Sequence, residues 1–401
     1  MASLDKFRSV LQVGASVALH MKRVLLVTDY FRPDPGGLEA LFTGVARAWQ
    51  AGALEVIANR VSRQSRSTPS DLAAFDKGED YKIIRPDYSQ SWQESLKFKA
   101  RMQELLEQRL TLFGPEHVLF GDLHRATRVS VPVLKTHQIP YSIFLNGNDL
   151  KNRLGFLHRA SRRIVMEAEN VFTLSRYLAR EARGYGIAED RITVLPPFFE
   201  SRWPRRSTNR LPQFLQKRIN KKILLLSLGP FVPRKGQDIL IESFARLQDL
   251  HHETHLLLAG SGPEFPFLQE LIRLHHLDEH VSLTGFLDDA TLAGVWKRAD
   301  IYVQPGRDRE DDVESLGMVF LEAAWFGVPM LAGRVGGVDE IVRHGVSGFV
   351  IEPGNRDDLS DKLRQMIVSD QLRLRFGKNA RDIARRDLDP DRICAFIHTR
   401  L

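Results

Sequence analysis

The sequence predicts an α/β protein of two domains, each built around an open parallel sheet. Short apolar runs that do not alternate with polar residues recur along the 401-residue chain, as in strands buried on both faces. Segments with apolar residues at helical spacing lie between them, which is typical of parallel sheets covered by helices. A basic stretch at 201–222 divides the runs into two series. We therefore predict two Rossmann-like domains facing each other across a cleft.

The individual elements follow from these runs. The strand candidates are residues 24–30, 54–60, 81–86, 117–122, 141–147, 170–175 and 192–197 in the first series, and 223–229, 255–260, 281–286, 300–305, 328–333 and 348–353 in the second. The helix candidates are residues 38–49, 237–247, 265–274, 289–298, 318–325 and 357–368. The predicted organisation is a loose extension (1–20), an N-terminal domain (21–200), a basic linker (201–222), a C-terminal domain (223–385) and a C-terminal helix that crosses back (386–401).

Composition predicts a cytoplasmic globular protein. Hydrophobic residues make up 43% of the chain and charged residues 27%, which are ordinary values for such proteins. Cys394 is the single cysteine, so an intramolecular disulfide is excluded and a reducing compartment is favoured. The chain contains no apolar run of about 20 residues, the length that a membrane-spanning helix needs.

The positive charge is unevenly distributed along the chain. Residues 1–200 carry a net charge of +6, residues 201–222 carry +8 and residues 223–401 carry −7. A basic N-terminal half and linker favour an anionic partner, such as an anionic membrane surface to which the protein binds peripherally. A solvated surface with a basic linker explains the same pattern. Because the chain has no recognised nucleic-acid motif, we predict no nucleic-acid partner.

Several turns at predicted strand ends have the chemistry of phosphate-binding loops. Gly36 and Gly37 precede a helix, where exposed N–H groups and the helix dipole favour an anion; a tight turn without a ligand would read the same. Residues 229–236, 260–263 and 315–317 repeat this arrangement in the second series, and the first of these adds two cations. No nucleotide-binding motif of the Walker or GxGxxG type occurs at these turns.

Two carboxylates flank the start of the helix predicted at 318–325. Glu314 lies in the preceding loop, and Glu322 lies inside an otherwise apolar helix, where an unpaired charge is costly. A ligand at the helix start could contact both carboxylates. The alternatives are a core carboxylate paired with a cation for Glu322 and a solvated loop residue for Glu314. The acidic run at 308–312 suggests a solvated or acceptor-facing loop more than a metal site.

The second series also resembles a known family. The matching segments, in order, are LGPFVPRKGQDILIESFARL (228–247), LLLAGSGPEFPFLQELI (256–272), VSLTGFLDDATLAGVWKRADIYVQPG (281–306), the pair Glu314 and Glu322, and AGRVGGVDEIVRHGVSGFVIEPGN (332–355). These segments resemble the retaining GT-B glycosyltransferases of the glycosyltransferase-4 group. In the first series only the turn at 33–37 and the segment 174–187 fit the family pattern.

The resemblance implies transfer of a sugar from a nucleotide-sugar donor, UDP- or GDP-linked, to a glycan, glycolipid or surface-polymer acceptor. It implies neither a metal nor a cofactor. Glu314 would bind hydroxyls of the donor sugar, Glu322 the ribose, and Arg234 and Lys235 the diphosphate. The predicted catalytic residues are Glu314, Lys235, Arg234 and Asp122. The predicted donor-binding residues are Gly36, Gly37, Gly229, Gly262, Ser315, Leu316, Gly317, Met318 and Glu322.

The sequence departs from the family pattern at positions that bear on the acceptor. Pro230 stands where the family usually has an arginine, and Arg234 is expected to take over its role. Asp122 and Asn146 stand where histidines are common in the family. We expect Asp122, His124, Asn146 and Asp149 on the acceptor side, although a histidine on such a loop can simply be solvated. A non-catalytic nucleotide-sugar-binding protein with the same fold is the alternative function.

Overall fold

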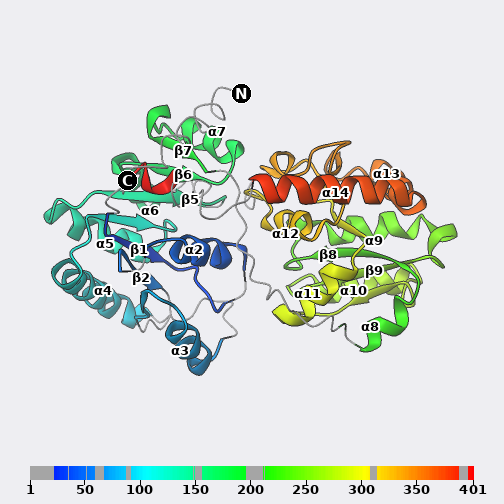
Figure 1. Cartoon of the computed structure of the whole chain (residues 1–401), viewed down its shortest axis with the longest axis horizontal. Helices are drawn as coiled ribbons and strands as arrows, with labels where there is room; N and C mark the ends of the chain where they lie inside the picture. The colour runs from blue at the N-terminus through cyan, green and yellow to red at the C-terminus, as the bar shows by residue number, and fades with distance from the viewer. Residues whose placement is uncertain are drawn as a thin grey trace.

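The computed structural model describes residues 22–34, 36–50, 52–58, 67–86, 92–147, 149, 156–195, 211, 213–307, 314–387 and 396–401. They form two α/β domains that lie side by side, each with one parallel sheet covered by helices (Figure 1). The predicted fold class is therefore confirmed, and every predicted strand region contains a strand.

The N-terminal sheet has seven strands in the order β3-β2-β1-β4-β5-β6-β7. The strands are β1 (Val24–Thr28), β2 (Leu54–Ala58), β3 (Lys82–Ile84), β4 (His117–Phe120), β5 (Tyr141–Leu145), β6 (Val171–Thr173) and β7 (Ile192–Val194). The helices are α2 (Gly37–Arg47), α3 (Pro69–Lys77), α4 (Trp92–Leu112), α5 (Arg125–Thr136), α6 (Phe156–Glu167) and α7 (Arg176–Gly184). All five residues of β1 are buried, as expected for a central strand covered on both faces.

The C-terminal sheet has six strands in the order β10-β9-β8-β11-β12-β13. The strands are β8 (Ile223–Leu228), β9 (Thr254–Ala259), β10 (Val281–Leu283), β11 (Ile301–Gln304), β12 (Met330–Gly333) and β13 (Gly348–Ile351). The helices are α8 (Gln213–Arg218), α9 (Gln237–Ala245), α10 (Phe265–Leu274), α11 (Asp289–Arg298), α12 (Met318–Phe326), α13 (Arg356–Val368) and α14 (Asp370–Asp387).

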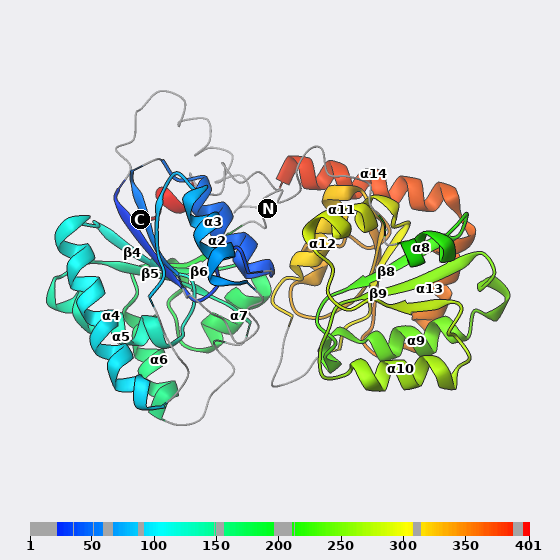
Figure 2. The same cartoon turned by 90° about the horizontal axis from the view of Figure 1, so that it is seen from below.

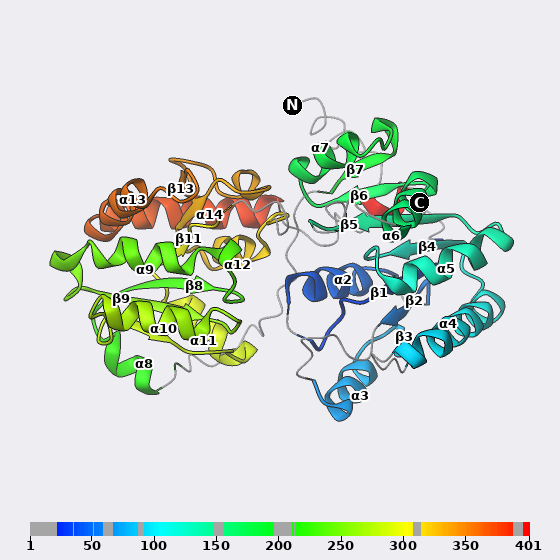
Figure 3. The ribbon, with the colours of Figure 1, turned by 180° about the vertical axis from the view of Figure 1, so that it is seen from behind.

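Both sheets reverse their strand order at the first strand of the domain. β1 lies between β2 and β4, and β8 lies between β9 and β11, with all pairs parallel. The loops that leave the carboxyl ends of such a strand pair turn to opposite faces, which opens a crevice where ligands bind. The starts of α2 and α12 approach each other where the two domains meet (Figure 3).

The segments outside the two sheets only partly follow the predicted boundaries. The predicted linker at 201–222 includes α8, whose Leu215 is buried, so its last part packs with the C-terminal domain. Residues 201–210 and 212 lie outside the described residues, as does the predicted extension at 1–20.

The chain end lies on the N-terminal domain, whereas the preceding helix α14 lies on the C-terminal one (Figure 2). Asn170 donates a hydrogen bond to the Arg400 carbonyl at 2.7 Å, and Lys22 donates one to the Leu401 carbonyl. The last described residues thus contact the N-terminal domain, although the long helix α14 lies on the C-terminal one. Within the described part of the chain, no helix is both long and apolar enough to cross a membrane.

Candidate active site

On the C-terminal side, the site is built from the loops that follow β8 and β11. A short 3-10 turn after β8 presents Arg234 and Lys235, and Glu314 precedes α12. One carboxylate oxygen of Glu314 accepts hydrogen bonds from Arg234 Nη1 at 2.5 Å and Lys235 Nζ at 2.6 Å. The side chain of Gln304, at the end of β11, donates to the same oxygen at 3.3 Å. Three predicted catalytic residues thus meet in one cluster.

The charges of this cluster fix the ionisation of its carboxylate. Burial alone would raise the pKa of Glu314, but the charges of Lys235 and Arg234 outweigh burial and hold the pKa below its usual value. Lys235 is only 4% exposed, so its ammonium depends on Glu314 and Gln304 for compensation. Two cations thus contact the Glu314 carboxylate beside the start of α12.

The first turn of α12 has no side-chain cap, and the loop that leads into it is closely packed. Gly317 is the N-cap at φ 80°, a left-handed conformation that favours glycine, and it leaves the helix without a side-chain cap. The first turn contains no acidic residue. A Cβ at Gly336 would lie 1.6 Å from the Glu314 carbonyl oxygen, so only glycine permits this approach. The predicted donor residues Ser315, Leu316 and Met318 lie on this held segment.

Glu322 lies inside α12 and is 8% exposed. One of its carboxylate oxygens accepts a hydrogen bond at 3.0 Å from the indole N–H of Trp296 in α11. This bond accounts for part of the cost of burying the carboxylate. The contact of Glu322 with a ribose stays a prediction.

The remaining predicted glycines line the same region. A Cβ at Gly37, the first residue of α2, would lie 2.9 Å from the Met318 Cβ, so the starts of α2 and α12 touch. Gly36 is the N-cap of α2. Gly229 follows β8 at φ 142°, and a Cβ at Gly262 would lie 2.4 Å from the Phe231 carbonyl oxygen.

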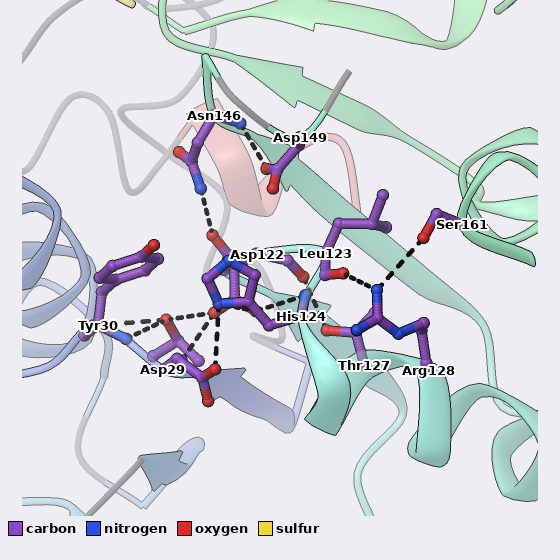
Figure 4. A network of polar contacts seen from close by, with 12 residues as sticks. Asp29, Tyr30, Asp122, Leu123, His124, Thr127, Arg128, Asn146, Asp149 and Ser161 are labelled. Carbon is purple, nitrogen blue, oxygen red and sulfur yellow. Dashed lines mark hydrogen bonds and ion pairs between the residues drawn. The ribbon is translucent and has the colours of Figure 1, made fainter. Parts of the chain in front are cut away.

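On the N-terminal side, the site is built around the buried carboxylate of Asp122, directly beyond β4 (Figure 4). One oxygen of Asp122 accepts from the Asp29 backbone N–H at 2.7 Å and from the Thr28 hydroxyl at 3.2 Å. The other oxygen accepts from the His124 backbone N–H at 3.0 Å. Asp122 therefore joins the loops that leave the adjacent strands β1 and β4.

Asp29 and His124 form an ion pair above this carboxylate. His124 Nδ1 lies 3.1 Å from an Asp29 carboxylate oxygen and 3.6 Å from Asp122, and its side chain is 40% exposed. The hydrogen bond to Asp29 raises the pKa of His124 to about 9, despite partial burial, with help from the Asp122 charge. Burial raises the pKa of Asp122, and the Asp29 charge adds to the increase. His124 is therefore a cation at neutral pH.

Asn146 and Asp149 lie next to this pair, as Figure 4 shows. The Asn146 side chain donates to the Gly121 carbonyl at 3.1 Å, and its backbone N–H donates to Asp149 at 2.8 Å. Burial raises the pKa of Asp149 to about 6. The four residues predicted for the acceptor side thus occupy neighbouring positions beyond β4 and β5.

The two halves of the site meet at Ser315. Its hydroxyl oxygen accepts from the Gly147 backbone N–H at 2.8 Å, and its carbonyl accepts from the Ser175 hydroxyl at 2.9 Å. Both donors belong to the N-terminal domain. The segment between the paired glutamates is therefore in direct contact with the predicted acceptor domain.

A metal-ligand set also occurs on the acceptor side. Within the described residues, ligand atoms of Asp29, Asp122 and His124 lie within 4.8 Å of one another. The Asp122 oxygens already accept N–H and O–H bonds, and His124 Nδ1 is paired with Asp29. Hydrogen bonds thus account for these groups, and independence of a metal stays a prediction.

Asp29 and Gln304 are not among the residues predicted from sequence. Each lies at or just beyond the carboxyl end of its strand, whereas Asp122 is predicted because it stands where the family commonly has a histidine. Asp29 falls inside the apolar run 24–30 and Gln304 inside the run 300–305, and both runs were assigned to strands as a whole. The strands end one or two residues earlier than their apolar patterns suggest.

The chain is similar in sequence to known glycosyltransferases. Residues 211–383 match the family model described as glycosyl transferases group 1. The GDP-mannose-dependent alpha-(1-6)-phosphatidylinositol monomannoside mannosyltransferase of Mycobacterium tuberculosis is 27% identical over 380 residues, which cover 90% of this chain and 93% of the relative. The alpha-D-kanosaminyltransferase of Streptomyces kanamyceticus is 23% identical over 373 residues, which cover 92% and 85%.

A solved structure supports the same assignment at the level of the fold. Anabaena HepE in complex with UDP-glucose matches with a TM-score of 0.76 at 18% identity, and the match covers 95% of this chain and 100% of that one. The two sheets, the cluster around Glu314 and the family match at 211–383 lead to one conclusion. The chain is a glycosyltransferase with the GT-B fold, and its residues 211–383 match the model of the glycosyl transferases group 1 family.

Proposed function

We propose that the protein is a retaining glycosyltransferase that moves a sugar from a nucleoside-diphosphate sugar to a glycan, a glycolipid or another surface-polymer precursor. The observation that carries this proposal is the cluster of Glu314, Arg234 and Lys235 beside the open start of α12. A relative named as GDP-mannose-dependent and a fold neighbour in complex with UDP-glucose support a nucleotide-sugar donor.

In this proposal the donor binds along α12 and the turn after β8. The diphosphate lies at the N–H groups of Leu316, Gly317 and Met318, where the helix dipole and the Arg234–Lys235 pair favour an anion. Glu314 accepts hydrogen bonds from hydroxyls of the sugar. Glu322, one and a half turns into the helix, binds the ribose.

Transfer then proceeds on the face of the sugar that the leaving group occupies. The acceptor hydroxyl oxygen forms a bond to the anomeric carbon while the bond from that carbon to the phosphate oxygen breaks. The electron pair goes to the diphosphate, and a diphosphate oxygen takes the hydroxyl proton. Arg234, Lys235 and the α12 N–H groups stabilise the charge that develops on the leaving group.

The acceptor-side residues take supporting roles in this proposal. Asp122 is 1% exposed and accepts three hydrogen bonds from the protein, so it holds the two loops and does not reach the acceptor. His124 is exposed on one side and protonated at neutral pH, so it orients or stabilises negatively polarised oxygen and does not remove a proton. Asn146 and Asp149 shape the adjoining wall.

A donor panel tests the proposal. We expect UDP or GDP to raise the melting temperature, because a ligand that binds only the folded state stabilises it. Incubation with UDP-glucose, GDP-mannose and related donors should release nucleoside diphosphate and give a product of the same anomeric configuration, visible by NMR. A chelator should leave this turnover unchanged. Nucleotide binding without turnover of any donor would favour the non-catalytic binding protein, and no shift with any nucleotide would overturn the donor site.

Peripheral attachment to anionic membranes is a further part of the proposal, motivated by the +8 charge at 201–222. We expect binding to vesicles that contain anionic lipid and loss of this binding as salt is raised. Equal binding to neutral vesicles would contradict this part alone.

A further inference from the structure

The first turn of α7 in the N-terminal domain lies against the donor-side loop of the C-terminal domain. The Ser175 hydroxyl donates to the Ser315 carbonyl oxygen at 2.9 Å and accepts from the Leu178 backbone N–H at 3.1 Å. Two residues after Ser175, a Glu340 carboxylate oxygen accepts from the Tyr177 backbone N–H at 3.2 Å. The N-terminus of α7 is therefore satisfied partly by its own domain and partly by the other domain.

This contact is closely packed and partly buried. Ser175 is 0% exposed. A Cβ at Gly337 would lie 2.6 Å from the Ser175 Cβ and 2.8 Å from the Ser315 carbonyl oxygen. The Ser315 carbonyl is thus held between Ser175 on one side and the Gly337 backbone on the other.

The held carbonyl belongs to the same peptide plane as the Leu316 N–H. Because a trans peptide is planar, fixing the direction of the carbonyl also fixes the opposite direction of the N–H. Leu316 N–H is one of the groups assigned to the donor diphosphate, and Glu314 immediately precedes Ser315. A single hydroxyl of the N-terminal domain therefore controls the orientation of a peptide in the donor site.

We propose that Ser175 is a positioning residue for transfer: it fixes the Ser315–Leu316 peptide, so the donor site is completed only when the two domains are in contact. Glu340, at the same helix start, is the second point of this contact. The inference rests on the proposed function and adds to it a residue that lies outside the donor domain.

Ser175 also has a structural role that the experiment must separate from positioning. As the N-cap of α7 its replacement by alanine costs about 1 kcal/mol of stability, whereas glycine, a good N-cap residue, costs only a few tenths. Ser175→Gly therefore removes the hydroxyl with little loss of the cap. Thr68 caps α3 of the same domain with its side chain and lies away from the site, so Thr68→Ala is the matched control for cap loss alone.

The test compares kcat, donor KM, nucleoside-diphosphate affinity and melting temperature for these variants in the full-length enzyme. We expect Ser175→Gly and Ser175→Ala to lower kcat by about tenfold or more, with KM and nucleotide affinity changing by less than about threefold, because the peptide acts mainly on charge that develops during transfer. Thr68→Ala should lower the melting temperature and leave kcat unchanged.

Glu340→Ala provides a second variant that leaves the Ser175 cap intact. It should also lower kcat, and it carries the test if the Ser175 variants do not fold. Wild-type kcat in Ser175→Gly or in Glu340→Ala would overturn the positioning role while leaving the proposed function standing. A wild-type enzyme that turns over no donor would instead overturn the proposed function, and this inference with it.

Discussion

The carboxylates on the two sides of the candidate site have pKa values shifted in opposite directions. On the C-terminal side, Glu314 lies between two cations that hold its pKa below the usual value. On the N-terminal side, burial raises the pKa values of Asp122 and Asp149, and His124 is the cation that lies among them. On the C-terminal side, two cations contact one carboxylate. On the N-terminal side, the carboxylates form a buried acidic cluster.

This difference separates donor binding from the pH dependence of transfer. On the donor side, the lowered pKa of Glu314 keeps its carboxylate ionised across the neutral range. The acceptor side changes its protonation between pH values of about 6 and 9, where Asp149 and His124 titrate. We therefore expect the pH dependence of transfer to arise in the N-terminal domain, although the leaving group is bound by the other domain.

The largest effect is expected from breaking the cluster around Glu314. Glu314→Ala should lower kcat by roughly a thousandfold, since it removes the sugar contact and the counter-charge that positions Lys235. It should also lower the unfolding free energy by about 3 kcal/mol, because a buried cation loses its partner. Donor turnover and thermal unfolding measure the two effects.

Arg364→Ala is the control for that variant, because its ion pair with Asp249 is exposed and should contribute little to stability. If Glu314→Ala retained wild-type turnover, the charge cluster would have no part in transfer, and the comparison between the two sides would lose its functional meaning.

The acidic cluster is tested through Asp29. A raised pKa in the folded state means that the His124 charge stabilises the fold fully below its unfolded value of about 6.5 and that this contribution is lost as pH rises through about 9. Asp29→Asn removes the main cause of the shift. We expect the alkaline limb of kcat/KM to move to lower pH by about one unit or more. Activity profiles and NMR titration of the imidazole report this shift.

His124→Gln is the matched control, since it should abolish the alkaline limb of kcat/KM. In the double variant, Asp29→Asn should then cause no further shift of the pH profile. An alkaline limb that persists unchanged in His124→Gln would mean that another group titrates, and the charge assigned to His124 would not govern transfer.

The strands and several site residues could be predicted from the sequence, whereas the contacts between the domains could not. Apolar runs predict each of the thirteen strands found in the described residues, since burial on both faces leaves a direct pattern. Asp122 and Asn146 could be predicted because they stand where the family commonly has histidines, and Glu314 because of its spacing from Glu322 before a helix start.

The pairing of residues across domains could not be predicted in the same way. Ser175 and Ser315 are separated by 140 positions, and their contact depends on the relative orientation of two sheets, which no periodicity encodes. The sequence shows which residues are acidic and which are basic. It does not show whether His124 is cationic or neutral, because this depends on a distance of 3.1 Å to a carboxylate on another loop.

A smaller effect is expected from the second carboxylate of the donor side. Glu322→Gln should weaken nucleotide binding by about tenfold if the ribose is its ligand, with kcat changing less than in Glu314→Ala. Because Trp296 donates to Glu322, Trp296→Phe removes that bond while keeping the aromatic volume. Calorimetric titration with the preferred nucleotide should show loss of affinity in Glu322→Gln and near-wild-type affinity in Trp296→Phe. Equal losses in both would assign Glu322 to the core.

The smallest effect concerns stability and compares the two sheets directly. Each sheet buries a histidine that is hydrogen-bonded to a serine on the next strand, His117 with Ser142 at 3.0 Å and His255 with Ser282 at 2.9 Å. Burial lowers the pKa of His117 to about 3 and that of His255 to about 4. Each neutral imidazole therefore contributes stability above pH 6.5 that is lost as pH falls, by about 1.4 kcal/mol per unit.

The surrounding carboxylates make the two domains respond differently to acid. In the N-terminal domain the raised pKa values of Asp122 and Asp149 mean that stability rises as these groups are protonated, which offsets the loss from His117. In the C-terminal domain the lowered pKa of Glu314 adds a loss of the same sign as that of His255. We expect the C-terminal domain to unfold first between pH 6 and 4, which calorimetry and hydrogen exchange can follow. His255→Gln should flatten its pH dependence, whereas earlier unfolding of the N-terminal domain would show that the buried acidic cluster does not offset His117.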